Sequence, residues 1–171
     1  MTTRHLTLAA VGALLSAVGL LSPAQAENQD MAALGKALPQ ATVSLEQGLK
    51  ASEREGKPIS GKFEIEHGAL QLSVYTEKGG KFSEVIVDHK TGNVKKSEVI
   101  TDGDDLKHAK VQTQAMSKSP TSLEKVVQDA VSENSGFRAV SAMPEMKGGQ
   151  PVVEVKLMKG AETKTVTKKL Q

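Results

Sequence analysis

The 171-residue chain contains no cysteine, no tryptophan, one tyrosine and three phenylalanines. Without cysteine there can be no disulfides, so stability must come from apolar burial and hydrogen bonding. The aromatic side chains are too few to build the stacking platform that binds single-stranded nucleic acid. Basic and acidic side chains are nearly balanced, at 22 and 20, so no bulk field attracts nucleic acid or anionic membranes. We therefore expect neither as a partner.

Motifs for catalysis are also missing. There is no G-x-S-x-G element, and the glycine pairs lack the strand, G-x-x-x-x-G-K and helix context of a phosphate loop. His67, His89 and His108 do not lie at the spacings typical of metal-ligating histidines. A chain this short also leaves little room for an enclosed pocket. We expect a protein that is not an enzyme and holds no cofactor or metal.

The first 26 residues have the composition of a secretory signal peptide. Arg4 gives a positive start, and residues 6–21 are apolar or small throughout. Pro23 ends this run, and Ala24-Gln25-Ala26 supplies the small residues that signal peptidase requires. The run is shorter than the roughly 20 residues of a spanning helix. We expect cleavage after Ala26 and a periplasmic or secreted protein with no membrane span and no lipid anchor.

Internal similarity predicts a duplication. Ser44-Leu45-Glu46 recurs as Ser122-Leu123-Glu124, 78 residues later. Leu72-Ser73-Val74 then corresponds to Val153-Glu154-Val155 at an offset of 81. The same offset relates two further pairs of segments in the same order, Ile59-Ser60-Gly61 with Val140-Ser141-Ala142 and Glu84-Val85 with Thr165-Val166. A run of matches in one order indicates two repeated units.

Each unit is predicted to begin with a helix. Ser44 with Gln47, and Thr121 with Glu124, have the form of a capping box. The first helix is the weaker one, because Gly48 lies inside it and costs about 1 kcal/mol relative to alanine. The second has one apolar stripe, made of Leu123, Val126, Val127, Ala130 and Val131.

Short strands of alternating polarity follow each helix. Tight turns are expected at residues 67–68 and 79–80 in the first unit, and at 148–149 and 160 in the second. Short turns make neighbouring strands antiparallel. The predicted fold class is α+β, with two tandem small units, each a helix packed on a short antiparallel β-sheet.

The predicted domain organisation has five parts. Residues 1–26 are the signal peptide, and residues 27–42 are a mature N-terminal leader with a brief helical pattern, loosely ordered. The first unit covers 43–100 and the second 122–171. Residues 101–121 connect them and contain a short amphipathic helix.

The first unit resembles the PepSY family. The resemblance is carried by the Ser-capped helix, the alternating strand pair and the stretch Glu84-Val85-Ile86-Val87-Asp88-His89-Lys90-Thr91-Gly92-Asn93-Val94. That stretch is similar to the family's closing strand and its Asp-x-x-Thr-Gly turn. The second unit stops at Lys168-Lys169-Leu170-Gln171 without this turn, and so resembles a truncated unit. PepSY modules occur in propeptides of thermolysin-like metallopeptidases and in exported bacterial proteins, and the resemblance implies protein binding or peptidase inhibition.

Asp88, Thr91 and Gly92 form the strongest local motif, and we interpret it as structural. An aspartate carboxylate accepts backbone N–H groups two residues further on, and glycine supplies a positive φ. The motif therefore predicts a closed turn and not a catalytic or metal-binding group.

Two functional hypotheses follow. The first is an exported, non-catalytic module that binds an unidentified protein or peptide of the cell envelope through a sheet face or an exposed edge strand. The alternative is a periplasmic copper-binding or envelope stress protein that uses Met143, Met146 and Met158 with a histidine, since thioethers favour Cu(I). Met143 and Met146 flank Pro144 at an expected hairpin, and methionine serves equally well to fill gaps in a core.

Overall fold

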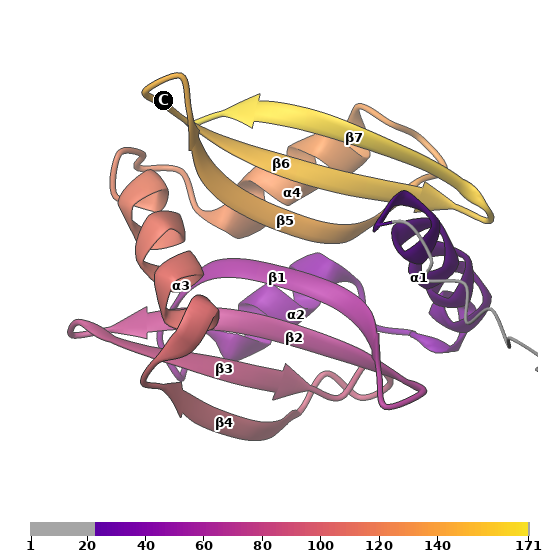
Figure 1. Ribbon diagram of the computed structural model, residues 1–171, viewed down its shortest axis with the longest axis horizontal. Coiled ribbons are helices and arrows are strands. Elements are labelled where there is room, and N and C mark those ends of the chain that lie inside the picture. Colours follow the sequence, from indigo (N-terminus) through magenta and orange to yellow (C-terminus); the bar gives the residue numbers. More distant parts are fainter. Residues whose placement is uncertain (1–22, 171) are drawn as a thin grey trace, which may run out of the picture.

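The computed structural model describes residues 23–170, so the predicted signal peptide lies almost entirely outside the described residues. The described part of the chain forms four α-helices, one 3-10 helix and seven strands (Figure 1). Their order is α1 (Pro23–Ala37), η1 (Leu38–Gln40), α2 (Leu45–Ser52), β1 (Lys57–Glu66), β2 (Ala69–Lys78), β3 (Lys81–Val87), β4 (Val94–Ile100), α3 (Gly103–Met116), α4 (Leu123–Ser132), β5 (Arg138–Lys147), β6 (Gln150–Lys159) and β7 (Glu162–Lys169). None of the helices in this part is long and apolar enough to cross a membrane.

All seven strands belong to one antiparallel sheet, in the order β4-β3-β2-β1-β5-β6-β7 (Figure 1). The predicted α+β class is confirmed, but the two separate sheets that the sequence predicts are replaced by a continuous one. The join is short: Gly61 pairs with Ala142, and Lys62 pairs with Ser141. Two separate sheets would have left β1 and β5 as exposed edges, and their pairing covers the middle of each.

The strand registers repeat at the offset of 81 residues. Val74 pairs with Val85 in the first half, and Val155 pairs with Val166 in the second. The ladder is irregular at Ile59 in β1 and at the equivalent Val140 in β5. The pair that joins the halves, Gly61 with Ala142, is itself related by the same offset. The two halves are therefore related by a local two-fold axis that passes through this pair.

Two-residue turns connect β1 to β2, β2 to β3, β5 to β6 and β6 to β7. His67 and Gly68 have φ of 48° and 78°, and the glycine pairs at 79–80 and 148–149 also have positive φ. Two positive φ values match the turns that suit the twist of an antiparallel hairpin. The sequence indicates a hairpin at Pro144. In the structure Pro144 instead lies inside β5, where it pairs with Val153. Proline is tolerated there because β5 pairs with β1 only at Ser141 and Ala142, so one side of the strand has no ladder partner at Pro144.

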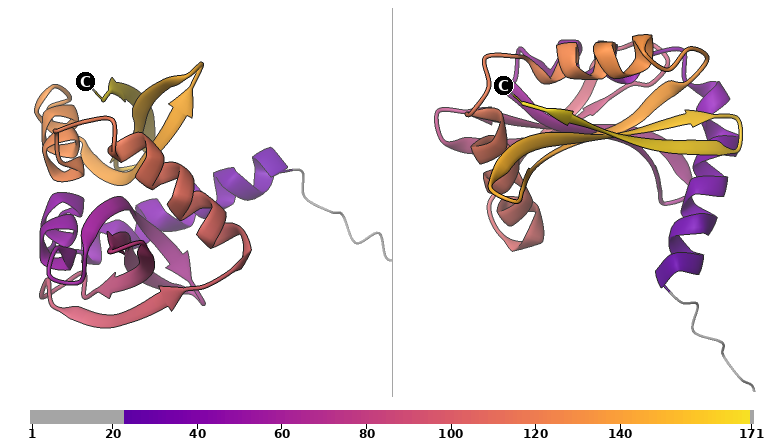
Figure 2. Two further views of the ribbon diagram at one scale, coloured as in Figure 1. Left: turned by 90° about the vertical axis from the view of Figure 1, so that its left-hand side faces the viewer. Right: turned by 90° about the horizontal axis from the view of Figure 1, so that it is seen from above.

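Helices α2 and α4 lie side by side on one face of the sheet, and they bury the main core (Figure 2). A full capping box of Ser44 and Gln47 starts α2. The cap of α4 is Ser122, whose side chain accepts the Lys125 N–H, so this helix starts one residue later than predicted from Thr121. Fully buried side chains from both halves form this core, among them Leu45, Leu49, Leu72, Val74, Val85, Val127, Val155 and Leu157.

Helices α1 and α3 project beyond the other face, near opposite ends of the strands (Figure 2). Ala109 of α3 packs on Ile59 and Phe82 in a second, smaller core cluster. The leader forms α1 and η1, as its brief helical pattern predicts, and it is packed onto the fold where loose order was expected. It is tied to the first half by the Thr42 and Val43 N–H groups, which donate to the His89 carbonyl oxygen at 3.0 Å each.

Candidate functional site

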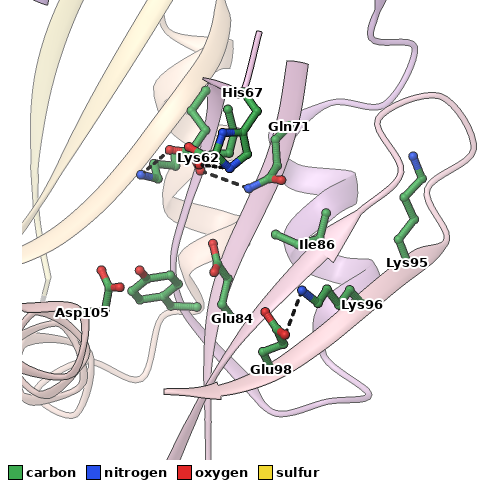
Figure 3. A pocket seen from close by; sticks show the side chains of 12 residues that line it. Lys62, His67, Gln71, Glu84, Ile86, Lys95, Lys96, Glu98 and Asp105 are labelled. Carbon is green, nitrogen blue, oxygen red and sulfur yellow. Dashed lines mark hydrogen bonds and ion pairs between the residues drawn. The ribbon is translucent and has the colours of Figure 1, made fainter. Parts of the chain in front are cut away.

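The face of the sheet opposite α2 and α4, which we call the open face, carries a polar groove of about 740 Å³ (Figure 3). Strands β1 to β4 form its floor, and the start of α3 forms one wall. The groove is lined by Lys62, Glu64, Glu66, His67, Gln71, Tyr75, Glu84, Ile86, Lys95, Lys96, Glu98 and Asp105.

Strand alternation explains why these side chains gather on one face. Lys62, Glu64 and Glu66 alternate along β1 with Phe63 and Ile65, which belong to or pack against the main core. Successive side chains of a strand point to opposite faces of a sheet. A strand that buries its apolar row under α2 must therefore present its charged row to the groove.

Ion pairs hold several of the groove side chains in place. Lys62 Nζ lies 2.5 Å from Glu64 Oε2, and Lys96 Nζ lies 2.8 Å from Glu98 Oε1. Gln71 also donates a longer hydrogen bond of 3.5 Å to Glu64 Oε1. Exposed pairs of this kind contribute little stability, about 0–1 kcal/mol each. A partner can therefore replace them at small cost.

The carboxylate of Glu84 lies beside another carboxylate in the sheet, which is unfavourable for its stability. Its carboxylate accepts a hydrogen bond of 2.5 Å from the Ser73 hydroxyl, and its direct cross-strand neighbour on β4 is Glu98. Like charges directly opposite each other destabilise a sheet. Figure 3 shows Glu84 of β3 and Asp105 of α3 pointing into the same part of the groove.

Tyr75 links the groove floor to α3. Burial, and then a hydrogen bond to the Asp105 carboxylate, raise the pKa of the Tyr75 phenol above its usual value. The phenol proton is retained because a tyrosinate beside a carboxylate is electrostatically unfavourable.

Replacement of Asp105 by asparagine should lower the pKa of Tyr75, since it removes both the charged acceptor and the repulsion of the ionised phenol. The chain has one tyrosine and no tryptophan, so the absorbance change of tyrosinate reports this group alone. Asp104→Asn is the matched control, because Asp104 is exposed and pairs with Lys107. An unchanged Tyr75 titration in Asp105→Asn would contradict the contact.

A smaller pocket of about 100 Å³ lies beneath α3 and adjoins the groove through Lys62, Tyr75 and Asp105. The Ser60 hydroxyl donates to Gln112 Oε1 at 2.8 Å, and Gln112 Nε2 lies 3.9 Å from Met143 Sδ. These contacts hold α3 across the joint between β1 and β5.

The open face continues over the second half of the sheet. A further pocket of about 460 Å³ has α1 as its wall, with Met31 and Leu34, and extends to Thr165 on β7. Lys147 donates to Glu154 Oε1 at 2.9 Å, and this bond lowers the pKa of the Glu154 carboxyl. Polar side chains therefore line the open face in both halves.

No protein-family model matches this chain. Neither the curated proteins nor the solved structures give a match either. The PepSY resemblance thus stays a prediction carried by the sequence features.

The motif at Asp88 closes the turn between β3 and β4. Asp88 Oδ1 accepts the N–H groups of Lys90 and Thr91 at 2.8 Å each, and Gly92 has φ of 76°. These bonds, with the Thr91 contribution largest, and Lys95 at 3.0 Å hold the pKa of the Asp88 carboxyl well below its usual range. The carboxylate is thus engaged within the turn.

The three methionines of the copper hypothesis do not converge. Met158 is buried in the main core, and Met146 packs against it. Met143 lies on the open face, three residues before Met146 on the same strand, and reaches the pocket under α3. Among residues 23–170, no three His, Cys, Asp or Glu side chains are grouped so as to hold a metal ion.

The groove itself could not be identified from motifs, because it collects side chains from four strands and one helix. The signal that was available is the alternation of charged residues along β1. His67 lies exposed in the turn between β1 and β2, at the groove rim, with Nε2 3.3 Å from Glu66 Oε1.

Proposed function

We propose that this protein is an exported, non-catalytic protein-binding module built from two PepSY-like units that share one sheet. Within residues 23–170, the second unit has no counterpart of the Asp88 turn or of β4. Support comes from the register repeat at 81 residues and from the signal-like composition of residues 1–26. The partner is a protein or peptide of the cell envelope, and binding to a peptidase would make the module inhibitory.

The polar groove on the open face carries this proposal. One face of the sheet is fully used by α2 and α4, whereas the other is left between α1 and α3 and is lined by charged and amide side chains. Interfaces between separately folded proteins are about as polar as the rest of the protein surface, and they contain about ten direct hydrogen bonds and a similar number of bridging waters. Glu84 and Asp105 would meet basic or N–H groups of the partner, which relieves the repulsion between Glu84 and Glu98.

A photo-crosslinking amino acid placed at single positions tests the groove in intact cells. Gln71 is inside the groove, and Gln128 is an exposed glutamine of α4 on the far side of the molecule, which makes it the matched control. We expect position 71 to capture one envelope partner that position 128 does not capture. Adding that partner to the purified chain should change the fluorescence of Tyr75, the only tyrosine.

Two outcomes would overturn the groove as the binding surface: equal capture from position 128, or a captured protein that leaves the Tyr75 fluorescence unchanged. An inhibition assay with a thermolysin-like metallopeptidase tests the narrower version. Failure to inhibit removes the peptidase as partner.

A further inference from the structure

The outer edge of β7 is the edge of the sheet in the second half, and its backbone groups there pair with no described strand. Within residues 23–170, β7 pairs with β6 alone. Its equivalent in the first half, β3, pairs with β2 on one side and with β4 on the other. The backbone groups that β3 uses to hold β4 therefore have counterparts on β7 that face no described strand.

Hydrogen bonds at the strand ends identify these counterparts. The Leu170 N–H donates to the Pro151 carbonyl at 3.0 Å, so Lys168 and Val166, two and four residues earlier, also face β6. Thr163, Thr165 and Thr167 then direct their N–H and C=O groups outward. The first half agrees: the Asp88 N–H donates to the Asn93 carbonyl at 2.8 Å, on the side of β4.

Lysines often protect an edge strand, but those of β7 are turned toward α4. Lys164 Nζ lies 2.6 Å from the Asn134 side-chain oxygen, and Lys168 Nζ lies 2.5 Å from Glu133 Oε2. Both partners follow the last turn of α4. The row of threonines that remains on the open face is uncharged and β-branched, which favours strand pairing. The lysines of β7 therefore hinder the pairing of another strand with this edge less than their number indicates.

We propose that β7 takes an extended acidic peptide segment of the partner as an eighth, antiparallel strand. The register would be the one that β4 takes on β3, so that Thr165 and Thr167 occupy the places of Glu84 and Ile86. This inference rests on the proposed protein-binding function and adds the segment that is recognised. Main-chain hydrogen bonds would supply the affinity, and alternate side chains the specificity.

Charge selects the occupant. The Lys164 ammonium donates to the neutral side-chain oxygen of Asn134, which does not compensate its charge, and Lys169 is exposed. Acidic side chains on an incoming strand therefore meet positive charge on β7. β-Branched residues fit opposite the threonines. A second copy of β7 would bring two strands of the same net charge together, which disfavours self-pairing.

A fluorescein-labelled peptide with the sequence Val-Glu-Thr-Glu-Thr-Glu-Val is the probe, titrated with the chain from residue 27 onward and followed by anisotropy. We expect saturable binding, weakened about tenfold when lysine replaces each glutamate of the peptide. Thr165→Pro should also weaken binding about tenfold, because it removes an outward N–H while leaving the bonds to β6 intact. Thr165→Val is the matched control and should bind like the unchanged chain. The urea midpoint of each variant verifies its fold.

If Thr165→Pro unfolds the chain, the proposal can still be tested with the unchanged chain and a modified peptide. In an added strand, every second N–H group of the peptide faces β7 and the others face away. Methylation of the nitrogens that face β7 should abolish binding, and methylation of the nitrogens that face away should leave it unchanged. No saturable binding below about 1 mM, or equal binding by the methylated peptides, would overturn the proposal. A chain that dimerises through β7 in sedimentation, and is released by Thr165→Pro, would also overturn it.

The experiments distinguish failure of the edge-strand proposal from failure of the groove proposal. Partner capture from position 71 that survives Thr165→Pro would remove the edge and leave the groove. Peptide binding with no capture from position 71 would remove the groove and leave the edge.

Discussion

Replacement of Arg138 by methionine should lower the free energy of unfolding by about 2–4 kcal/mol. The guanidinium of this residue donates to three backbone carbonyls, two in the leader and one at the start of the first unit: Nη1 to Leu38 at 3.3 Å and Ala41 at 3.2 Å, and Nη2 to Val43 at 3.2 Å. Leu38, Ala41 and Val43 are each at most 7% exposed. A hydrogen bond from a charged donor contributes about 1.5–3 kcal/mol, and an unpaired buried acceptor costs about 1–3 kcal/mol. The three bonds come from one half-buried guanidinium, so their contributions do not add in full.

Arg138 connects parts of the fold that are otherwise far apart in sequence. It is the first residue of β5, in the second half, whereas the leader is held on its other side by the His89 carbonyl of the first half. Loss of the guanidinium should therefore loosen α1 and η1 before the sheet unfolds. Amide exchange at Thr42 and Val43 should accelerate more than exchange in β6, which local opening explains and a uniform loss of stability does not.

Urea unfolding of the purified chain measures the effect, and Lys57→Met is the matched control. Lys57 begins β1 as Arg138 begins β5, and it is exposed. Its replacement should change stability by no more than about 0.5 kcal/mol. Arg138→Lys should recover only part of the loss, because an ammonium cannot reach three carbonyls with the planar fork of a guanidinium. A loss below about 0.5 kcal/mol in Arg138→Met would show that water replaces the guanidinium.

The hairpins and their registers could be predicted from the sequence because they depend on local patterns. Alternation along β1 and the positive-φ turns at 67–68 and 79–80 fix which residues face the core. The offset of 81 residues, found first as sequence similarity, reappears in the pairs that Val74 and Val155 form. Local chemistry was sufficient for these elements.

The joining of the halves could not be predicted in this way. Only Gly61, Lys62, Ser141 and Ala142 form the ladder between β1 and β5, and nothing in either strand alone marks it as a partner of the other. The groove has the same difficulty, since Glu84 and Asp105 meet only after β3 and α3 are placed. Arg138 was missed because its acceptors are backbone carbonyls, which have no sequence signature.

Gly48 is the clearest case in which local preference and packing disagree. Alanine is the better helix former by about 1 kcal/mol, so Gly48→Ala would stabilise α2 if the helix were isolated. A Cβ atom at this position would lie 2.5 Å from Leu72 Cδ2 and 3.1 Å from Leu72 Cγ. Leu72 is fully buried and cannot move toward solvent. Overpacking of about 1–3 kcal/mol should exceed the gain in helix propensity, leaving Gly48→Ala less stable by about 1–2 kcal/mol.

The second half of the molecule provides the compensating change. At the positions equivalent to Gly48 and Leu72 it carries Val126 and Val153, a larger helix residue with a smaller strand residue, both buried in the same core. Leu72→Val alone should cost about 1 kcal/mol through the cavity that it leaves. In the double variant the new methyl group occupies this space, so the two losses should not add, and we expect a favourable coupling of about 1 kcal/mol or more. Urea unfolding of the four proteins measures the coupling, and strict additivity would show that the helix moves away from the sheet instead of repacking against it.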